Sequence, residues 1–368
     1  LHLCDRRQRQ MCIRDRQKAV QMAGVNTFES LVEWYDTLCR FMNPVKDGHM
    51  FVRRDMNVSG IMSTYLPEFY AEAETKAVND TLLVRMWTDG KQPWRILNAV
   101  NGQQASERLQ YCRQITNAAT EVHRDKMAAE KMLSSAEYGT PFVIQTVDAS
   151  GQTHEDTIYA QSQNIKKVEK ERQPVKKLEN GILYVDATSR ELNEKLFLSA
   201  LTPDVRGLCF DLRGLPTYQF EDILAHLIAA DAKAPATEVA INNFPYQQNV
   251  TWRVDSETLK ARQPHIALPA TFLCDGATVS WGETILMMVR HYKLGKIAGQ
   301  TTAGTTGDMT QFLLPLFPFS MTGMLMRCMD GEPHHARGIK PDITIPVYAT
   351  DYINGYDRIL NVALGMDE

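Results

Sequence analysis

Strand-like and helix-like segments alternate through the second half of the chain, and this alternation restricts the possible folds more than any other feature. Short apolar runs predict strands, and apolar residues at helical spacing predict helices between them. The predicted strands are 182–187, 207–212, 238–241, 270–274 and 296–299, and the predicted helices are 190–200, 220–230 and 284–292. Alternation of this kind is typical of a largely parallel sheet covered by helices, so we expect an α/β fold.

The first half of the chain has a different pattern. Apolar residues at helical spacing predict helix within residues 17–43, with Asn26 or Thr27 as a cap and Pro44 as the end. Residues 57–166 mix strands with two helices, at 105–116 and 121–134, and a lysine- and glutamate-rich linker follows. We therefore expect a non-native or disordered start at 1–16, a helical segment at 17–56, an α+β region at 57–166, a linker at 167–180 and the α/β domain at 181–368.

Composition is ordinary for a globular protein of 368 residues, with a net charge of −4. That charge predicts no general attraction to nucleic acid or to an anionic membrane, so neither is expected as a partner. No apolar run reaches about 18 residues, so no membrane-spanning helix is expected. The seven cysteines are scattered and predict neither a disulfide framework nor a zinc site.

The first 16 residues are dense in arginine, contain two cysteines and do not begin with methionine. They have no apolar core of the kind that signal peptides carry. Our hypothesis is that this stretch is not native and stands in place of a lost start, which could have been secretory.

One segment, residues 272–283, carries the strongest chemical signal. It reads as a buried strand, a tight turn, and then Ser280 at the beginning of a helix. Helix N–H groups converge at that point and can stabilise a developing oxyanion. A serine at this position is also a common helix cap, and both interpretations stay open.

Three further motifs accompany Ser280 in a fixed order. Asp47-Gly48-His49 comes first, then the strand and glycine turn at 207–214, then Ser280 with segment 299–304 downstream, and last Gly338-Ile339-Lys340-Pro341-Asp342-Ile343. Together they resemble the S41 family of tail-specific, C-terminal-processing proteases, and more closely its tricorn-core-like branch with a histidine base. The resemblance covers roughly residues 30–365.

The resemblance implies a crotonase-like core of ββα units with a PDZ-like insert. It also implies a serine endopeptidase that acts through an acyl-enzyme on unfolded or C-terminal polypeptide segments, without a cofactor or metal. The base maps onto His49, the nucleophile onto Ser280 and a further acidic residue onto Glu283. The oxyanion hole maps onto the backbone N–H groups of Gly214 and Trp281. Relatives are usually exported in bacteria, which predicts a periplasmic or other extracytoplasmic location.

The residue chemistry is consistent with these roles. A serine hydroxyl needs a neighbouring base, and neutral imidazole near pH 7 suits that task. A side chain at Gly214 would keep a carbonyl oxygen away from the N–H. Glu283 lies one helical turn from Ser280 on the same face, so it could hydrogen-bond the hydroxyl or the base.

Several features depart from the family pattern. The stretch that holds a lysine base in processing proteases has Thr305 and Thr306 instead, which raises the importance of His49. Leu215-Pro216-Thr217 replaces a glycine-rich continuation of the oxyanion loop. The residue that orients His49 is left open, with Asp47 and Glu332 as candidates.

Each candidate also has a purely structural explanation. His49 could be an ordinary turn histidine, and Glu283 could complement the helix dipole. His334 and His335, with Cys328 upstream, do not predict a metal site, because adjacent histidines on a strand point to opposite faces and no third ligand accompanies them.

Three functions compete on these residues. The leading one is a serine peptidase. A catalytically inactive peptide-binding protein of the same fold is the main alternative, since the oxyanion loop is altered. A crotonase-type acyl-CoA enzyme is the third, and the chain offers no obvious cluster for an adenine phosphate.

Overall fold

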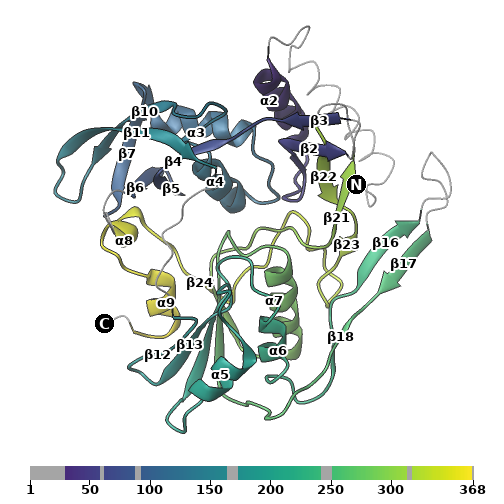
Figure 1. The fold of residues 1–368 in the computed structure, drawn as a ribbon. Coiled ribbons are helices and arrows are strands. Elements are labelled where there is room, and N and C mark those ends of the chain that lie inside the picture. Colours follow the sequence, from purple (N-terminus) through teal and green to yellow (C-terminus); the bar gives the residue numbers. More distant parts are fainter. Residues whose placement is uncertain are drawn as a thin grey trace. The chain divides into compact units, whose positions relative to one another are not determined.

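The computed structural model describes residues 30–58, 62–87, 93–163, 173–241, 251–312 and 317–366, and its chain divides into two compact units (Figure 1). The first unit holds residues 1–168, 309–321 and 348–356, and the second holds 169–308, 322–347 and 357–368. The predicted start at 1–16 and the predicted caps Asn26 and Thr27 lie outside the described residues.

The second unit is built on a six-stranded sheet. Its strand order is β12 (Val175–Lys177), β13 (Ile182–Asp186), β14 (Gly207–Asp211), β19 (Ala270–Cys274), β20 (Lys296–Gly299) and β24 (Ile343–Thr344). The last five strands pair in parallel, and β12 is antiparallel to β13. The α/β prediction and four of its five strands are confirmed within a residue or two.

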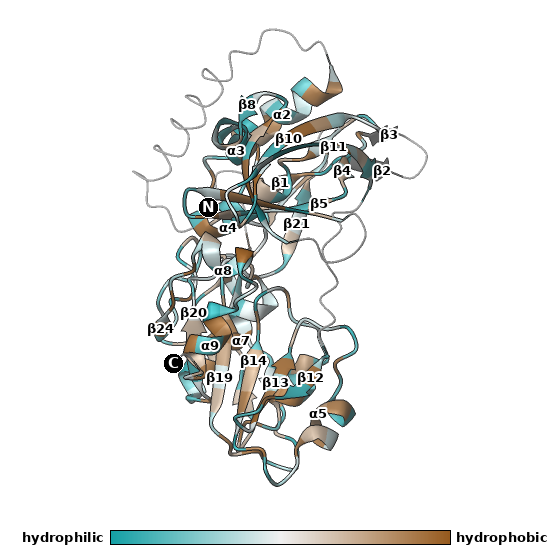
Figure 2. Ribbon diagram, turned by 90° about the vertical axis from the view of Figure 1, so that its left-hand side faces the viewer, coloured by the Kyte–Doolittle hydropathy of each residue, from teal (hydrophilic) through white to brown (hydrophobic). Residues whose placement is uncertain are grey.

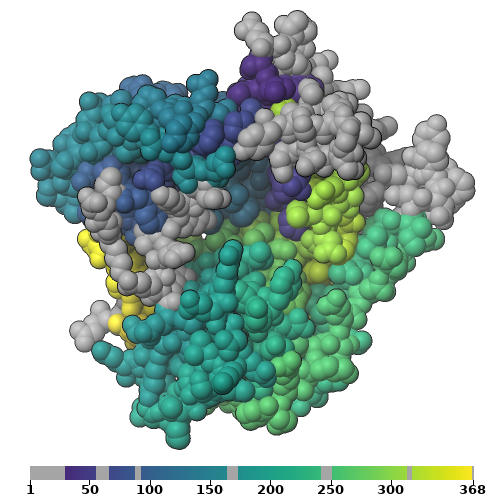
Figure 3. Space-filling model, in the orientation of Figure 1, coloured from purple at the N-terminus to yellow at the C-terminus, as the bar shows by residue number. Residues whose placement is uncertain are grey.

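The fifth predicted strand, 238–241, does not join this sheet. It forms β16 (Thr237–Ile241), which pairs antiparallel with β17 (Thr251–Asp255) and with β23 (Leu325–Met326). Its residues are half-buried or exposed, so it lacks the two covered faces of a central parallel strand. The space-filling view shows this hairpin at the margin of the second unit (Figure 3). A two-stranded pair, β15 (Ala232–Lys233) and β18 (Thr258–Leu259), completes the strands described in this unit.

The helices described in this unit are α5 (Glu194–Ala200), α6 (Phe220–Leu224), α7 (Trp281–Tyr292) and α9 (Arg358–Ala363). In Figure 1, α6 and α7 lie to one side of the sheet and α9 lies to the other. The helix predicted at 220–230 is wrong in length, because the carbonyls of Ala225 and His226 accept hydrogen bonds from Arg262 and Ile266 instead of continuing the helix.

Aromatic packing fills the core of the second unit. The rings of Phe210 and Phe272 stack with centroids 5.0 Å apart, and Phe220 meets Phe210 edge-on at 5.3 Å. All three side chains are fully buried. Strands β13, β14 and β19 accordingly stand out as hydrophobic in Figure 2. Burial on this scale fixes the sheet from which the neighbouring turns project.

Close backbone approach makes one glycine of this sheet necessary. Gly299 ends β20 with φ +129°, where any Cβ would collide with the carbonyl oxygen of Cys274. The glycine therefore allows β20 and β19 to lie side by side where the chain enters the 300–307 segment.

The described residues of the first unit form three sheets. The largest has the order β5 (Ala73–Val78), β6 (Thr81–Met86), β7 (Arg95–Val100), β10 (Pro141–Val147), β11 (Thr153–Ser162), β4 (Phe69–Ala71) and β9 (Ser134–Ser135), with β8 (Gln103–Gln104) beside β7. The others join β1 (Phe51–Val52) to β22 (Phe319–Thr322) and β21 (Met309–Phe312), and β2 (Asp55–Val58) to β3 (Met62–Tyr65).

The helices described in the first unit are α2 (Leu31–Met42), α3 (Ala105–Gln114), α4 (Glu121–Glu130) and α8 (Ala349–Ile353). Ser30 caps α2 by accepting a hydrogen bond from Glu33 N at 3.2 Å. The predicted helix at 121–134 is too long, because the chain turns after α4 and forms β9. Among the described residues, no helix has the length and apolarity that a membrane span requires.

Candidate active site

Ser280 has a backbone conformation that serines rarely adopt. It links the turn after β19 to the start of α7, with φ +55° and ψ −118°. A non-glycine residue at positive φ is strained and persists only where its surroundings hold it, which is frequent at functional sites. The Ser280 side chain makes no capping hydrogen bond, so its interpretation as an ordinary helix cap is wrong.

Backbone hydrogen bonds hold Ser280 in place. Its N–H donates to Thr305 O at 2.8 Å, and its carbonyl oxygen accepts from Thr306 Oγ1 at 3.0 Å. The Glu283 N–H also donates to that carbonyl oxygen, at 2.9 Å. Segment 302–306 thus supports the turn that contains Ser280, and Thr305 and Thr306, which stand where the resemblance places a lysine, have structural contacts of their own.

Glu283 is fully buried and its carboxylate faces this same segment. Oε1 accepts hydrogen bonds from Thr302 Oγ1 and from Gly304 N at 2.7 Å, and Oε2 accepts from Thr305 N at 2.8 Å. Among the described residues these hydrogen bonds, and an ion pair with His334, are the contacts of the carboxylate. They tie α7 to the segment that holds Ser280.

His334 was not singled out by the sequence as a functional residue. It is buried, and its Nε2 lies 3.2 Å from Glu283 Oε2, as an ion pair rather than a well-aligned hydrogen bond. Burial lowers the pKa of His334, but its interactions with Cys328 and with the Glu283 carboxylate outweigh that effect and raise its pKa to about 9. The imidazole is therefore protonated at neutral pH and balances the buried carboxylate.

The Gly338–Asp342 motif anchors the other side of segment 302–306. Ile339 N donates to Thr302 Oγ1 at 2.7 Å, and Thr302 N donates to Ile339 O at 3.2 Å. Gly338 has φ +71°, and a Cβ there would lie 2.6 Å from Thr302 O. This motif therefore has a structural reason: only glycine permits the two segments to pack so closely.

The turn containing Gly214 lies beside the start of α7. A Cβ placed on Gly282 would lie 3.1 Å from Pro216 Cδ and 3.5 Å from Gly214 O. In the observed conformation the Gly214 N–H donates to Leu212 O at 2.8 Å. The same carbonyl accepts from Thr278 Oγ1 at 2.7 Å. The N–H assigned to an oxyanion hole is therefore occupied within its own turn.

Trp281, the second expected oxyanion donor, is the first residue of α7. Its backbone N–H has no hydrogen-bond acceptor among the described residues, as is usual in the first turn of a helix. That N–H follows the Ser280 hydroxyl directly in the chain, so it is available to a carbonyl oxygen under attack.

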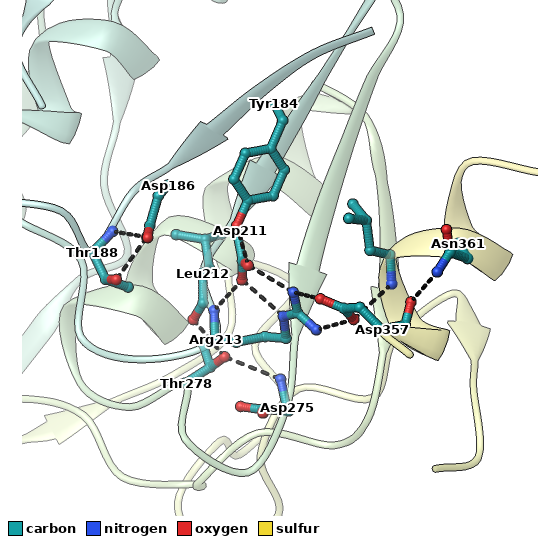
Figure 4. A network of polar contacts seen from close by, with 11 residues as sticks. Tyr184, Asp186, Thr188, Asp211, Leu212, Arg213, Asp275, Thr278, Asp357 and Asn361 are labelled. Carbon is teal, nitrogen blue, oxygen red and sulfur yellow. Dashed lines mark hydrogen bonds and ion pairs between the residues drawn. The ribbon is translucent and has the colours of Figure 1, made fainter. Parts of the chain in front are cut away.

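A buried ionic network supports the Gly214 turn (Figure 4). Arg213 lies between two carboxylates: its Nε and Nη2 donate to Asp211 at 2.9 and 2.7 Å, and its Nη1 and Nη2 donate to Asp357 at 2.6 and 2.8 Å. Tyr184 completes the site by donating to Asp211 Oδ2 at 2.6 Å. Burial lowers the pKa of Arg213, but the two carboxylates outweigh it and raise that pKa well above its ordinary value.

His49 lies in a tight turn of the first unit. Its N–H donates to Asp47 Oδ1 at 2.9 Å, and its carbonyl oxygen accepts from Ser320 Oγ at 2.8 Å. These contacts fix the backbone that presents the imidazole. Because Ser280 belongs to the second unit, the pairing of His49 with Ser280 stays a prediction.

The structure bears differently on the two candidates for orienting His49. Asp47 is buried and its carboxylate accepts the backbone N–H of His49. Glu332 lies in the second unit, is largely exposed and approaches Arg337 at 3.5 Å. Among the described residues, no group of three or more histidine, cysteine or acidic side chains is arranged to bind a metal.

Comparison with solved structures identifies the fold. The chain is similar to mature CPAF, with a TM-score of 0.67, 13% identity, and coverage of 91% of this chain and 87% of that one. Mature CPAF complexed with lactacystin matches with a TM-score of 0.65 and 13% identity, over 87% of this chain and 85% of that one. A candidate peptidase from Parabacteroides merdae matches with a TM-score of 0.54 and 15% identity, over 96% of this chain and 87% of that one. No curated protein matches the chain by sequence.

The fold and the serine turn thus define a mixed α/β protein of the architecture found in those chains. Residues 185–345 match the family described as peptidase family S41. The resemblance to this family that the motifs carry is confirmed over those residues.

Proposed function

We propose that the protein is a serine endopeptidase in which Ser280 is the nucleophile and His49 is the general base. One observation supports this most strongly: Ser280 occupies a strained backbone conformation, while its hydroxyl is not used to cap the helix that follows. Strain of this kind is characteristic of residues held for a reaction.

In the proposed reaction, His49 accepts the hydroxyl proton as Ser280 Oγ attacks the peptide carbonyl carbon. The carbonyl π electrons move to oxygen, and the Trp281 N–H stabilises the oxyanion. The intermediate then collapses, the C–N bond breaks, and the amine leaves with the proton from His49. Water releases the acyl group by the same steps, with His49 again as base.

The second oxyanion donor requires a local change. The Gly214 N–H must turn away from Leu212 O before it can reach a substrate oxygen. Leu212 O keeps the Thr278 hydroxyl as a donor after that turn, so it is not left without a hydrogen bond. Rotation of the Arg213–Gly214 peptide is therefore part of the proposed function.

The remaining features of the proposal rest on family resemblance. Substrates are unfolded or C-terminal polypeptide segments, and the α+β region at 57–166 is a PDZ-like insert that binds them. The domain at 181–368 is a crotonase-like core. The protein acts in the periplasm or elsewhere outside the cytoplasm, and fractionation of the source cells tests that location.

A fluorophosphonate probe tests the chemistry, because attack by an activated serine Oγ on phosphorus expels fluoride and leaves a stable adduct. We expect labelling of the wild type, none of Ser280→Ala, and strongly reduced labelling of His49→Gln. Ser199→Ala, which removes an exposed hydroxyl on α5, serves as the matched control and should label normally. Equal labelling of wild type and Ser280→Ala would refute the assignment of the nucleophile.

The alternative function is a catalytically inactive peptide-binding protein of the same fold. The internal hydrogen bond of the Gly214 N–H favours it, since the hole lacks one donor in this conformation. Calorimetric binding of unfolded peptides, unchanged in Ser280→Ala and accompanied by no cleavage, would support this alternative over the peptidase.

A further inference from the structure

We propose that His334 and Glu283 form a positioning pair that holds segment 302–306, and through it the backbone of Ser280, in the geometry required for attack. The inference rests on the proposed serine hydrolase function and gives two residues a role in it. Glu283 then acts through the segment, without touching substrate or transferring a proton.

The contacts form a short continuous path. The Glu283 carboxylate accepts the N–H of Thr305, and the carbonyl oxygen of that residue accepts the N–H of Ser280. Both hydrogen bonds are 2.8 Å long. The peptide groups on either side of one buried residue thus connect the carboxylate directly to the nucleophile.

A second path runs through the neighbouring threonine. Thr306 Oγ1 donates to Ser280 O, and its oxygen also lies 3.0 Å from Thr284 Oγ1. Both ends of the serine's backbone are therefore held by segment 302–306. A residue at φ +55° relaxes unless such contacts persist.

His334 is needed because the carboxylate is fully buried. A buried charge requires a partner of opposite sign, and within the described residues the His334 imidazolium is the cation beside Glu283. Next along the chain, Ala336 N donates to Gly304 O at 3.0 Å, so the histidine's own segment is attached to the segment that it stabilises.

Glu283→Gln tests the hydrogen-bonded path from residue 283 to Ser280 by changing one acceptor atom, Oε2. An amide oxygen in place of Oε1 can still accept from Thr302 and Gly304, but the amide nitrogen then faces the Thr305 N–H. Two donors repel, so the variant loses the hydrogen bond that leads to Ser280 while side-chain volume is kept.

The same unit offers a matched control. His226 is also buried and pairs with Glu194 Oε1 at 2.8 Å, and its other ring nitrogen contacts Pro264 O. Within the part of the chain that the structure describes, this second histidine–glutamate pair makes no contact with segment 302–306 or Ser280, so His226→Gln measures the general effect of removing such a pair.

The experiment compares the fluorophosphonate labelling rate with thermal stability in wild type, Glu283→Gln, His334→Gln, the double variant and His226→Gln. We expect both single variants to label on the order of 100-fold more slowly while still folded. The double variant should label no more slowly than the slower single variant, because each single substitution already removes the interaction between Glu283 and His334. His226→Gln should lose stability but label at the wild-type rate. Wild-type labelling rates in folded Glu283→Gln and His334→Gln would overturn the proposal.

Two further measurements keep the test decisive. If the pair variants do not fold, Thr306→Val removes only the hydroxyl that donates to Ser280 O, and an unchanged labelling rate there contradicts the proposal. If wild type does not label, the peptidase assignment fails by itself. Hydrogen exchange of peptides containing Ser280 then decides: faster exchange in Glu283→Gln, but not in His226→Gln, supports the positioning pair, and no difference overturns it.

Discussion

Replacement of Arg213 is expected to have a large and specific effect on the second unit. Arg213→Met keeps the length of the aliphatic stem but removes the cation between Asp211 and Asp357 (Figure 4). Asp211 is wholly buried, so its carboxylate loses the guanidinium that donates to both of its oxygens, while it keeps the hydrogen bonds from the Tyr184 hydroxyl and the backbone N–H of residue 213.

The magnitude follows from that burial. Removing one partner of a buried ion pair costs about 3–5 kcal/mol, since a buried charge is left uncompensated. Asp357→Asn is the matched comparison. Its amide oxygen can still accept from Arg213 and cap Leu360, and about a third of the Asp357 side chain is exposed, so we expect a loss of about 1 kcal/mol after solvent screening.

The pKa of Asp357 predicts how the stability difference between wild type and Asp357→Asn changes with pH. Burial raises the pKa of Asp357, but Arg213 outweighs it and holds that pKa below its ordinary value. A carboxyl with a lowered pKa in the folded state stabilises the protein above its unfolded-state pKa, near 4, and the effect is lost as pH falls further. The deficit of Asp357→Asn relative to wild type should therefore be full at pH 7 and shrink toward pH 3.

Hydrogen exchange of peptides covering β14 and β19 measures the opening free energy of this sheet directly. We expect Arg213→Met to lower that energy several times more than Asp357→Asn does at pH 7. Equal effects of the two variants would show that Asp211 does not depend on the arginine charge, and the reasoning from burial would fail.

Three further predictions concern the serine turn. The raised pKa of His334 means that the stability from its ion pair is fully present below about pH 6.5 and is lost as pH rises through about 9, so urea unfolding should show wild type losing up to roughly 3 kcal/mol relative to His334→Gln over that range. Gly299→Ala should prevent folding of the second unit or cost more than about 3 kcal/mol, because its Cβ meets Cys274 O, and a soluble variant with an unchanged melting temperature would contradict this. Thr278→Val removes the hydroxyl that donates to Leu212 O, which should cost about 1–3 kcal/mol and slow fluorophosphonate labelling; normal values of both would exclude a link between the two turns.

The sheet of the second unit could be predicted because strands that are buried on both faces consist of continuous apolar residues. Strands such as 207–211 and 270–274 are continuous apolar runs, and their central position follows from that. The segment at 237–241 is also apolar in part, but its position in a hairpin depends on pairing with residues that are distant in the chain. Periodicity cannot distinguish these two cases.

The order of motifs was sufficient to predict the match of residues 185–345 to peptidase family S41, while the contacts that hold Ser280 could not be derived from it. Positive φ at Ser280 arises from hydrogen bonds to residues 25 and 26 positions later, which no local pattern encodes. In the sequence, His334 is only one of two adjacent histidines that do not predict a metal site. Its pairing with Glu283 could not be predicted, because the role of a histidine depends on the charged groups that lie beside it in the folded protein. The family's lysine position holds threonine here, and those threonines bind Glu283 and the serine backbone instead. Thr305 and Thr306, which stand where the resemblance places a lysine base, and the buried pair of Glu283 and His334 are thus parts of one arrangement that holds the backbone of Ser280.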